Sequence, residues 1–395
     1  MKQILFFGMA IGLLAVSVSA RAQKDMRALI KNNEAFAAAQ YKILMKNVPD
    51  HQMPQYYDPA KEQLAVSDVN WWTSGFYPGT LWLIYKATGD PEILVEAKKK
   101  LTIEEPMKYY TGNHDIGFMI FCSFGNAYAI TGDPHYRDVI LTAAETATKR
   151  YRPGMHAIQS WNKSQKFNAP VIIDNMMNLE LLEWASRNGG SRQLAEIAVN
   201  HANTTLKNHF RTDGSSYHVV DYDTATGRVL KRVTHQGYAD ESAWARGQAW
   251  GLYGYTMMYR FTRKPEYLAH AHKIARFILN NPNLPADKVP YWDFNAPDIP
   301  NAPRDVSAAA VMASALLELA QYSNKKQRTF YQTNAATQLR SLSTTYRSKP
   351  GESKGFLLTQ SVGHLPGHSE VNVSLTYADY YFMEALERYK QWVLK

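Results

Sequence analysis

Apolar residues recur every three to four positions along almost the whole chain, usually on faces rich in alanine. This period predicts twelve helices, at residues 25–46, 75–88, 91–109, 115–130, 134–150, 174–187, 191–208, 243–261, 265–280, 304–322, 326–346 and 372–393. Strand-like alternation is short and is confined to connections such as 217–222 and 355–358. The pattern is therefore typical of an all-α protein.

Tight corners join several of these helices in pairs. Residues 88–91 read Thr-Gly-Asp-Pro, the same four residues recur at 131–134, and Thr-Arg-Lys-Pro holds the corresponding place at 262–265. Glycine ends one helix and proline begins the next, so each run predicts a helical hairpin. Six such hairpins must stack to bury their apolar faces. Because half of the helices are rich in glycine and aromatic residues, we expect a closed (α/α)6 barrel, with an open α-solenoid as the alternative.

The chain begins with the features of an export signal. An uncharged apolar run extends from Ile4 to Val18, and Ala-Arg-Ala at 20–22 fits a cleavage site. The run is too short for a comfortable membrane span. We therefore predict a cleaved signal peptide at residues 1–22, followed by a single catalytic barrel domain at residues 23–395. The mature protein is expected to be exported, soluble and free of the membrane, and periplasmic if its source is Gram-negative.

Composition narrows the chemistry further. With 395 residues, 45% hydrophobic and 20% charged, the chain is not of a disordered or low-complexity class. A single cysteine, Cys122, excludes a disulfide framework and a multi-cysteine metal site. The net charge is +9, or +7 without Lys2 and Arg21, and the basic residues are scattered. This distribution gives only weak support to nucleic-acid binding, and an acidic small substrate fits it at least as well. No cofactor or metal motif is found, and the oligomeric state is left open.

The longer connections are expected to meet at one end of the barrel. Those at 47–74, 151–173, 210–242, 281–303 and 347–371 all lead into predicted inner helices, which run in the same direction. Such a rim is where a binding pocket is expected. Its aromatic and polar residues are Trp71, Trp72, His114, Asp115, Trp161, Asp174, His218, His235, Gln236, Arg246, Tyr291, Trp292, Arg304 and His364.

Two carboxylates at the rim are the strongest catalytic candidates. Asp115 and Asp174 begin predicted neighbouring inner helices, so their side chains should enter the same cavity. An aspartate at a helix start is also an ordinary cap, which is the competing interpretation. Asp174 follows Val-Ile-Ile and precedes two methionines. Apolar neighbours raise the pKa of a carboxyl, and a second carboxylate raises it further, which suits a general acid.

Further along, Arg246 and Trp250 lie four residues apart and should share a helix face. A guanidinium can bind a carboxylate while an indole stacks on a sugar ring. The competing interpretation for Arg246 is a structural ion pair with Asp240 or Glu241. His218 likewise has a purely structural alternative.

Four motifs together carry a family resemblance. They read Trp-Thr-Ser-Gly-Phe-Tyr-Pro-Gly at 72–79, His-Asp-Ile-Gly-Phe at 114–118, Ile-Asp-Asn-Met-Met-Asn at 173–178 and Trp-Ala-Arg-Gly-Gln-Ala-Trp at 244–250. In this order they resemble the unsaturated glucuronyl hydrolases of glycoside hydrolase family 88, and Asp-Tyr-Tyr-Phe-Met-Glu-Ala-Leu at 379–386 resembles that family's last helix. The resemblance covers about residues 50–390.

The resemblance implies an (α/α)6 barrel that removes a 4,5-unsaturated uronic acid from the non-reducing end of lyase-generated oligosaccharides by hydrating the vinyl ether. It implies that Asp174 is the general acid and base, that Asp115 is the second carboxylate, and that no cofactor is needed. The residues that it assigns to substrate binding are Trp72, Trp161 and Trp250 as stacking walls, and His114, His218, Gln236 and Arg246 as ligands of the uronate.

The identity of the neighbouring sugar stays open. Residues 360–365 lack the Ser/Lys-rich pattern associated with sulfate binding in some family members, so the sulfation preference is not determined. A glycosaminoglycan fragment is favoured. The alternatives are an unsaturated galacturonyl hydrolase acting on pectin fragments, an inverting glycosidase acting on a saturated glycan, and a non-catalytic sugar-binding barrel.

Overall fold

The computed structural model describes the backbone of residues 2–395 and the side chains of residues 23–395. The predicted signal peptide at residues 1–22 lies outside the fully described residues, so its cleavage and the export of the protein stay predictions. In the part of the chain that is described, no helix is long and apolar enough to span a membrane.

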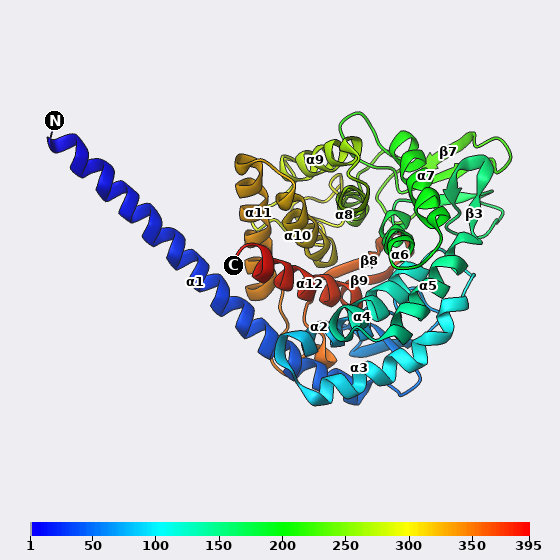
Figure 1. Ribbon diagram of the computed structural model, residues 1–395, viewed down its shortest axis with the longest axis horizontal. Coiled ribbons are helices and arrows are strands. Elements are labelled where there is room, and N and C mark those ends of the chain that lie inside the picture. Colours follow the sequence, from blue (N-terminus) through cyan, green and yellow to red (C-terminus); the bar gives the residue numbers. More distant parts are fainter. Residues whose placement is uncertain (1) are drawn as a thin grey trace.

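In the described part of the chain, twelve α-helices make up most of the structure (Figure 1). They are α1 (Lys2–Asn47), α2 (Phe76–Thr88), α3 (Pro91–Glu104), α4 (Asn126–Thr131), α5 (Pro134–Thr148), α6 (Asn175–Arg187), α7 (Arg192–Asn208), α8 (Ala245–Thr262), α9 (Pro265–Leu279), α10 (Val306–Gln321), α11 (Lys325–Thr344) and α12 (Thr376–Trp392). A π-helix, Gly117–Gly125, leads directly into α4. The all-α prediction is confirmed.

Six of the helices form a closed inner ring. In order, α2, the π-helix, α6, α8, α10 and α12 each contact the next, and α12 returns to contact α2. The helices α3, α5, α7, α9 and α11 pack outside the inner helices that precede them, and α1 packs against α2 and α12 (Figure 1). The closed (α/α)6 barrel is therefore confirmed, and the open solenoid is wrong.

Small residues let the inner helices approach one another closely. A Cβ added at Gly75 would lie 2.0 Å from the carbonyl oxygen of Met119, and one added at Gly254 would lie 2.5 Å from Cβ of Met176. The glycine-rich inner helices predicted from the sequence are thus explained by backbone contact across the ring.

Short corners close one end of the barrel as predicted. Gly89 and Gly132 adopt left-handed φ values of 70° and 69°, which a residue without Cβ reaches without strain. Each is followed by an aspartate that caps the next helix. Asp90 accepts the N–H of Glu92 at 3.0 Å, and Asp133 accepts the N–H of His135 at 2.9 Å.

Nine short strands occupy the connections. They are β1 (Met53–Asp58), β2 (Gln63–Ser67), β3 (Tyr151–Arg152), β4 (Ala157–Ile158), β5 (Pro170–Ile172), β6 (Val219–Tyr222), β7 (Val229–Val233), β8 (Ser361–His364) and β9 (Ser369–Leu375). They form antiparallel sheets in the orders β2-β1-β9-β8, β3-β4 and β5-β6-β7.

The strand predictions are partly corrected by this arrangement. The strand expected at 217–222 is confirmed by β6, whereas the strand expected at 355–358 is wrong, because only Leu358 forms a bridge there, with Arg347. The last helix begins at Thr376 rather than at 372, because β9 continues to Leu375. Strand β9 therefore delivers its residues directly to the start of an inner helix.

Asp133 provides a test of the corners. We expect Asp133→Ala to lower the free energy of unfolding by about 1 kcal/mol, because α5 loses its cap. Asp133→Asn keeps an acceptor at the same position and should lie close to the wild type. Denaturant unfolding measures both variants, and equal losses in the two would contradict the capping role.

Candidate active site

A cavity of about 300 Å³ opens where the inner helices begin. It is lined by Trp71, Trp72, Asp115, Trp161, Ile172, Asp174, His235, Gln236, Arg246, His364, Ser369, Glu370 and Tyr377. Six of the nine predicted site residues are in this wall, namely Asp115, Asp174, Trp72, Trp161, Gln236 and Arg246. Long connections supply most of the others, as expected for the rim.

Asp174 is held against apolar side chains at the start of α6. Its neighbours Ile172, Ile173 and Met177 are buried, and its own side chain makes no capping hydrogen bond to the helix. Burial raises the pKa of Asp174 to about 7, although the charge of Arg246 and the nearby Trp250 indole N–H act in the opposite direction. The competing capping interpretation of Asp174 is wrong, and its carboxyl is left free for chemistry near neutral pH.

Asp115 lies two residues before the π-helix, Gly117–Gly125, that neighbours α6. Burial raises the pKa of Asp115 well above its ordinary value, and the charge of Asp174 raises it further. The Asn178 amide and the Arg150 guanidinium act in the opposite direction. An ionised Asp174 therefore disfavours ionisation of Asp115.

His218 lies behind the cavity wall. Its Nδ1 accepts the backbone N–H groups of His235 and Gln236, each at 3.1 Å. Burial holds the pKa of His218 well below its ordinary value, so the ring is neutral and its proton is on Nε2. That nitrogen is 3.8 Å from Oδ2 of Asp174. His218 is thus placed to act on Asp174, while its predicted contact with the substrate stays a prediction.

The other two predicted site residues that lie outside the cavity wall, His114 and Trp250, are both buried. His114 is buried with Nε2 at 3.4 Å from Oδ1 of Asp115, and burial lowers its pKa to about 3. Trp250 is fully buried, and its ring packs against Phe118 and Tyr381 with centroid distances of 5.4 and 5.5 Å. The predicted roles of His114 as a ligand of the uronate and of Trp250 as a stacking wall stay predictions.

Arg246 is fixed by several partners at once. It pairs with Asp305 at 3.0 Å, and it donates to the carbonyl of Gly363 at 2.7 Å and to that of Val362. Its guanidinium also stacks on Trp244 at 4.6 Å. The structural ion pair weighed for Arg246 therefore exists, but its partner is Asp305 and not Asp240 or Glu241. Sequence reasoning missed Asp305, which lies 59 residues away.

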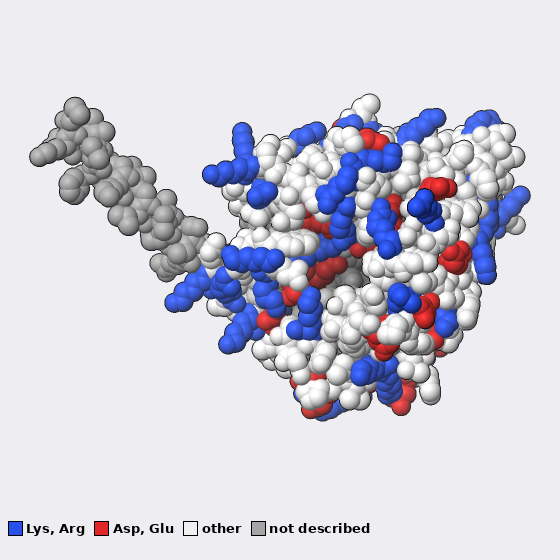
Figure 2. Space-filling model, in the orientation of Figure 1, with Lys and Arg blue, Asp and Glu red and all other residues white. Residues whose placement is uncertain are grey.

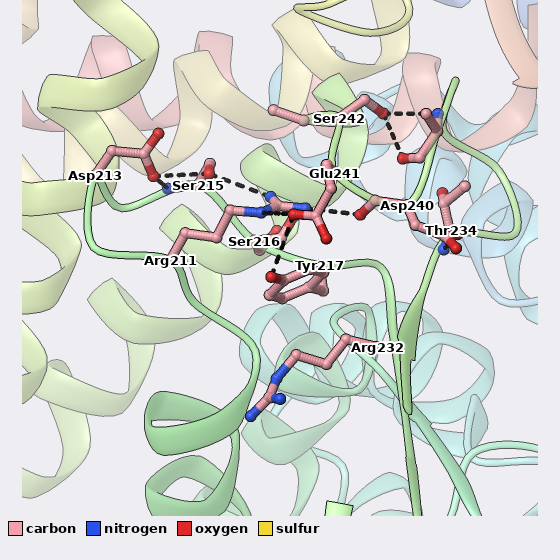
Figure 3. Close-up of polar contacts among 12 residues, drawn as sticks. Arg211, Asp213, Ser215, Ser216, Tyr217, Arg232, Thr234, Asp240, Glu241 and Ser242 are labelled. Carbon is pink, nitrogen blue, oxygen red and sulfur yellow. Dashed lines mark hydrogen bonds and ion pairs between the residues drawn. The ribbon is translucent and has the colours of Figure 1, made fainter. Parts of the chain in front are cut away.

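The loop at 234–242 is clamped by a polar cluster around Arg211 (Figure 3). Arg211 stacks on Tyr217 at 3.8 Å and donates to the carbonyl of Asp240 at 2.8 Å. Oδ1 of Asp240 in turn accepts the N–H of Thr234 at 2.8 Å. The clamp holds the loop at 234–242, which supplies His235 and Gln236 to the cavity wall, against the segment 211–217 that leads into His218.

Sequence reasoning missed three residues of the wall near the chain's end. Ser369 and Glu370 are on β9, and Tyr377 is in the first turn of α12. The alternation of polar and apolar residues in Glu-Val-Asn-Val-Ser-Leu at 370–375 was the available signal for a strand here. Among the described residues, no group of three or more His, Cys, Asp or Glu could hold a metal ion. Lys and Arg side chains are spread over the face in Figure 2 rather than gathered in one patch.

Comparison with known proteins gives a consistent result. The family described as Glycosyl Hydrolase Family 88 matches residues 44–394. An unsaturated glucuronyl hydrolase of Formosa agariphila is 40% identical over an alignment of 407 residues that covers 100% of each chain.

Solved structures agree with this comparison. The crystal structure of an unsaturated glucuronyl hydrolase specific for heparin is 44% identical, with a TM-score of 0.89 over 92% of this chain and 97% of that one. An Asp-to-Asn mutant of the Streptococcus agalactiae unsaturated glucuronyl hydrolase, complexed with dGlcA-GalNAc6S, is 30% identical. It has a TM-score of 0.79 over 92% of each chain.

The raised pKa of Asp174 has a cost in stability that can be measured. An unfolded chain loses this proton near pH 3.8, whereas the folded chain keeps it until about pH 7. Wild-type stability should therefore fall over this interval relative to that of Asp174→Asn, which has no proton to lose. We expect the variant to become more stable than the wild type by up to about 4 kcal/mol at pH 8. A difference that is the same at pH 5 and pH 8 would contradict the assignment.

Proposed function

The chain belongs to glycosyl hydrolase family 88, and we propose that it is an unsaturated glucuronyl hydrolase. Its substrates are oligosaccharides that lyases generate from glycosaminoglycans. It removes a 4,5-unsaturated uronic acid from their non-reducing end. One solved relative is described as an unsaturated glucuronyl hydrolase specific for heparin, and another is complexed with dGlcA-GalNAc6S. The observation that carries the proposal is the pair of buried carboxyls in one cavity, of which Asp174 has a pKa of about 7.

The reaction begins with Asp174 in its protonated form. It donates its proton to C4 of the double bond, which leaves an oxocarbenium-like cation between C5 and the ring oxygen. The Asp174 carboxylate then takes a proton from water as the water oxygen bonds to C5. The hemiketal formed at C5 opens, and the shortened sugar is released. One water is consumed, and Asp174 regains its proton.

The surroundings of Asp174 suit both halves of this cycle. Burial keeps the carboxyl protonated near neutral pH, ready to donate. Once it is ionised, the charge of Arg246, the Trp250 N–H and the Nε2–H of neutral His218 stabilise the carboxylate. We assign Asp115 to orienting the substrate and to adjusting the proton affinity of Asp174, because the two charges interact.

The remaining wall residues fit a sugar acid. Trp72 packs against Tyr377 with a centroid distance of 5.2 Å, and Trp161 lies edge-on to His235 at 5.3 Å, so both indoles are held as rigid walls for a sugar ring. Gln236 donates to the same Gly363 carbonyl that Arg246 binds, at 3.0 Å. We assign Gln236 and Arg246 to the uronate carboxylate, because they bring amide and guanidinium donors to the same wall.

Turnover of unsaturated disaccharides tests the proposal. The purified protein should abolish the near-ultraviolet absorbance of the conjugated double bond in glycosaminoglycan disaccharides made by lyases. Asp174→Asn should lose at least about a hundredfold in kcat while it keeps most of its affinity. Asp133→Asn, which lies outside the cavity, is the matched control and should retain full activity.

Each alternative predicts a different outcome of the same assay. Loss of absorbance only with pectin-derived fragments would favour the galacturonyl hydrolase. No loss with either substrate class would refute an enzyme of this type and leave an inverting glycosidase for saturated glycans, which turnover of such a glycan would reveal, or a sugar-binding barrel.

The pH dependence follows from the same residue. Activity should fall as pH rises through the pKa of Asp174, which is about 7, because the general acid is then deprotonated. Trp250→Phe keeps the ring but removes the N–H that stabilises the carboxylate, so it should move this basic limb of kcat/KM to higher pH. A limb that stays in place or moves to lower pH would show that Trp250 does not influence Asp174.

A further inference from the structure

Arg150 is a buried guanidinium without an acidic partner. It is only 5% exposed, and no Asp or Glu side chain among the described residues forms an ion pair with it. Burial lowers the pKa of Arg150, and the carboxyl whose charge opposes this effect is that of Asp115. Burying a charge without a counter-charge costs free energy of desolvation, so packing alone would favour a neutral residue here. The guanidinium is therefore expected to have a function of its own.

This guanidinium joins two segments that lead into the active site. Its three nitrogens all donate, and the acceptors are oxygens of Thr111 at 2.8 Å, Gly112 at 3.3 Å, Gln159 at 2.8 Å, Ser160 at 3.1 Å and Asn162 at 3.0 Å. A planar guanidinium donates in several directions from one rigid group, which an ammonium group does not. One side chain therefore fixes residues 111–112 against residues 159–162.

Each of the two segments brings a residue to the cavity wall. Asp115 follows the first segment, and its N–H is accepted by Oδ1 of Asn113 at 2.9 Å, so the turn is held as far as the carboxyl. Trp161 is in the second segment, where its carbonyl accepts Nε2 of Gln159 at 2.9 Å. Both Asp115 and Trp161 line the cavity. Arg150 thus connects a carboxyl and a stacking wall of the cavity from behind.

The charge of Arg150 also reaches the titratable groups beside it. Burial raises the pKa of Asp115, whereas the charge of Arg150 acts in the opposite direction. Burial lowers the pKa of His114 to about 3, and the same charge lowers it further. The guanidinium therefore favours a carboxylate at Asp115 and a neutral ring at His114. A neutral donor in its place would keep some hydrogen bonds but would lose this influence.

We propose that Arg150 is a positioning residue for the reaction, which locks the turn before Asp115 to the segment that carries Trp161. The spacing between the carboxyl and the stacking wall is then set before the sugar enters. The charge of the guanidinium keeps the ionised form of Asp115 accessible in a buried site. This role rests on the proposed function, in which both cavity residues act on the unsaturated uronate.

Arg150→Lys and Arg150→Gln separate the hydrogen bonds from the charge. Lysine keeps the charge but cannot bind both segments in the same geometry, and glutamine loses the charge as well. We expect KM for an unsaturated glycosaminoglycan disaccharide to rise about tenfold in both variants. Carbon-13 NMR should show Asp115 titrating at higher pH in Arg150→Gln but near its wild-type position in Arg150→Lys. The resonance of Asp115 is identified by its absence from Asp115→Asn.

Arg137→Gln is the matched control for the loss of one positive charge. Arg137 is exposed on α5 and pairs with its neighbour Asp138 at 3.1 Å, outside the cavity. This variant should keep KM within about twofold of the wild type and leave the titration of Asp115 unchanged. An equal shift of that titration in Arg150→Lys and Arg150→Gln would overturn the influence of the charge.

Trp161→Ala tests whether Arg150 acts through the stacking wall. If it does, Arg150→Lys should raise KM much less in Trp161→Ala than in the wild type, because the wall is already lost. Fully additive effects would overturn the proposal. Asn162→Ala removes one acceptor and keeps the charge, so it carries the test if Arg150→Gln does not fold. We expect it to raise KM about twofold to threefold with the titration of Asp115 unchanged.

The titration of Asp115 needs no substrate and so separates this inference from the proposed function. If the wild type hydrolyses no unsaturated disaccharide but Arg150→Gln alone shifts the titration, the proposed reaction is wrong and the action of Arg150 on Asp115 stands. If hydrolysis occurs and neither KM nor the titration differs in the two Arg150 variants, the positioning role is wrong and the reaction stands.

Discussion

The rest of the site depends on burying one carboxyl without a full counter-charge. Asp174 is surrounded by isoleucine and methionine side chains, and burial is the largest influence on its pKa. Arg246 does not cancel this effect, because Asp305 and two backbone carbonyls already hold its guanidinium. A direct ion pair between Arg246 and Asp174 would give a permanently ionised carboxylate, which could not donate a proton near pH 7. Arg246 therefore stabilises the ionised form of Asp174 by its charge, but it does not pair with Asp174 directly and so leaves the protonated form accessible.

The closed barrel supplies this environment. Because all inner helices begin at the same end, residues far apart in sequence, such as Asp115, Asp174 and Tyr377, reach one cavity. The glycine contacts bring neighbouring inner helices close together, and the buried rings of Trp250 and Phe118 pack against each other. The long connections then close around the opening. The clamp around Arg211 holds one of them so that two backbone N–H groups fix the tautomer of His218.

Much of this could be predicted from the sequence, because the relevant signals are local. Helical periods and the repeated Gly-Asp-Pro corners predicted the barrel, and the motifs around Asp115 and Asp174 predicted the family, which the match over residues 44–394 confirms. The misses have two causes. The pairing of Arg246 with Asp305 joins residues 59 positions apart, so no local pattern predicts it. The tautomer of His218 and the hairpin that presents Glu370 depend on how short neighbouring strands pair, which their brief sequence patterns do not specify. Strand β9 is short and runs directly into α12, so its polar and apolar alternation was not distinguished from the start of that helix.

Asp174 keeps its proton to near-neutral pH because of where the fold buries it. Carbon-13 NMR of aspartate-labelled protein, titrated from pH 4 to pH 9, measures this directly when the wild type is compared with Asp174→Asn. The account predicts one carboxyl resonance that titrates near pH 7 in the wild type and is absent from the variant. A resonance of Asp174 that titrates near pH 4 would contradict the account, because the residue would then be ionised whenever the reaction needs an acid.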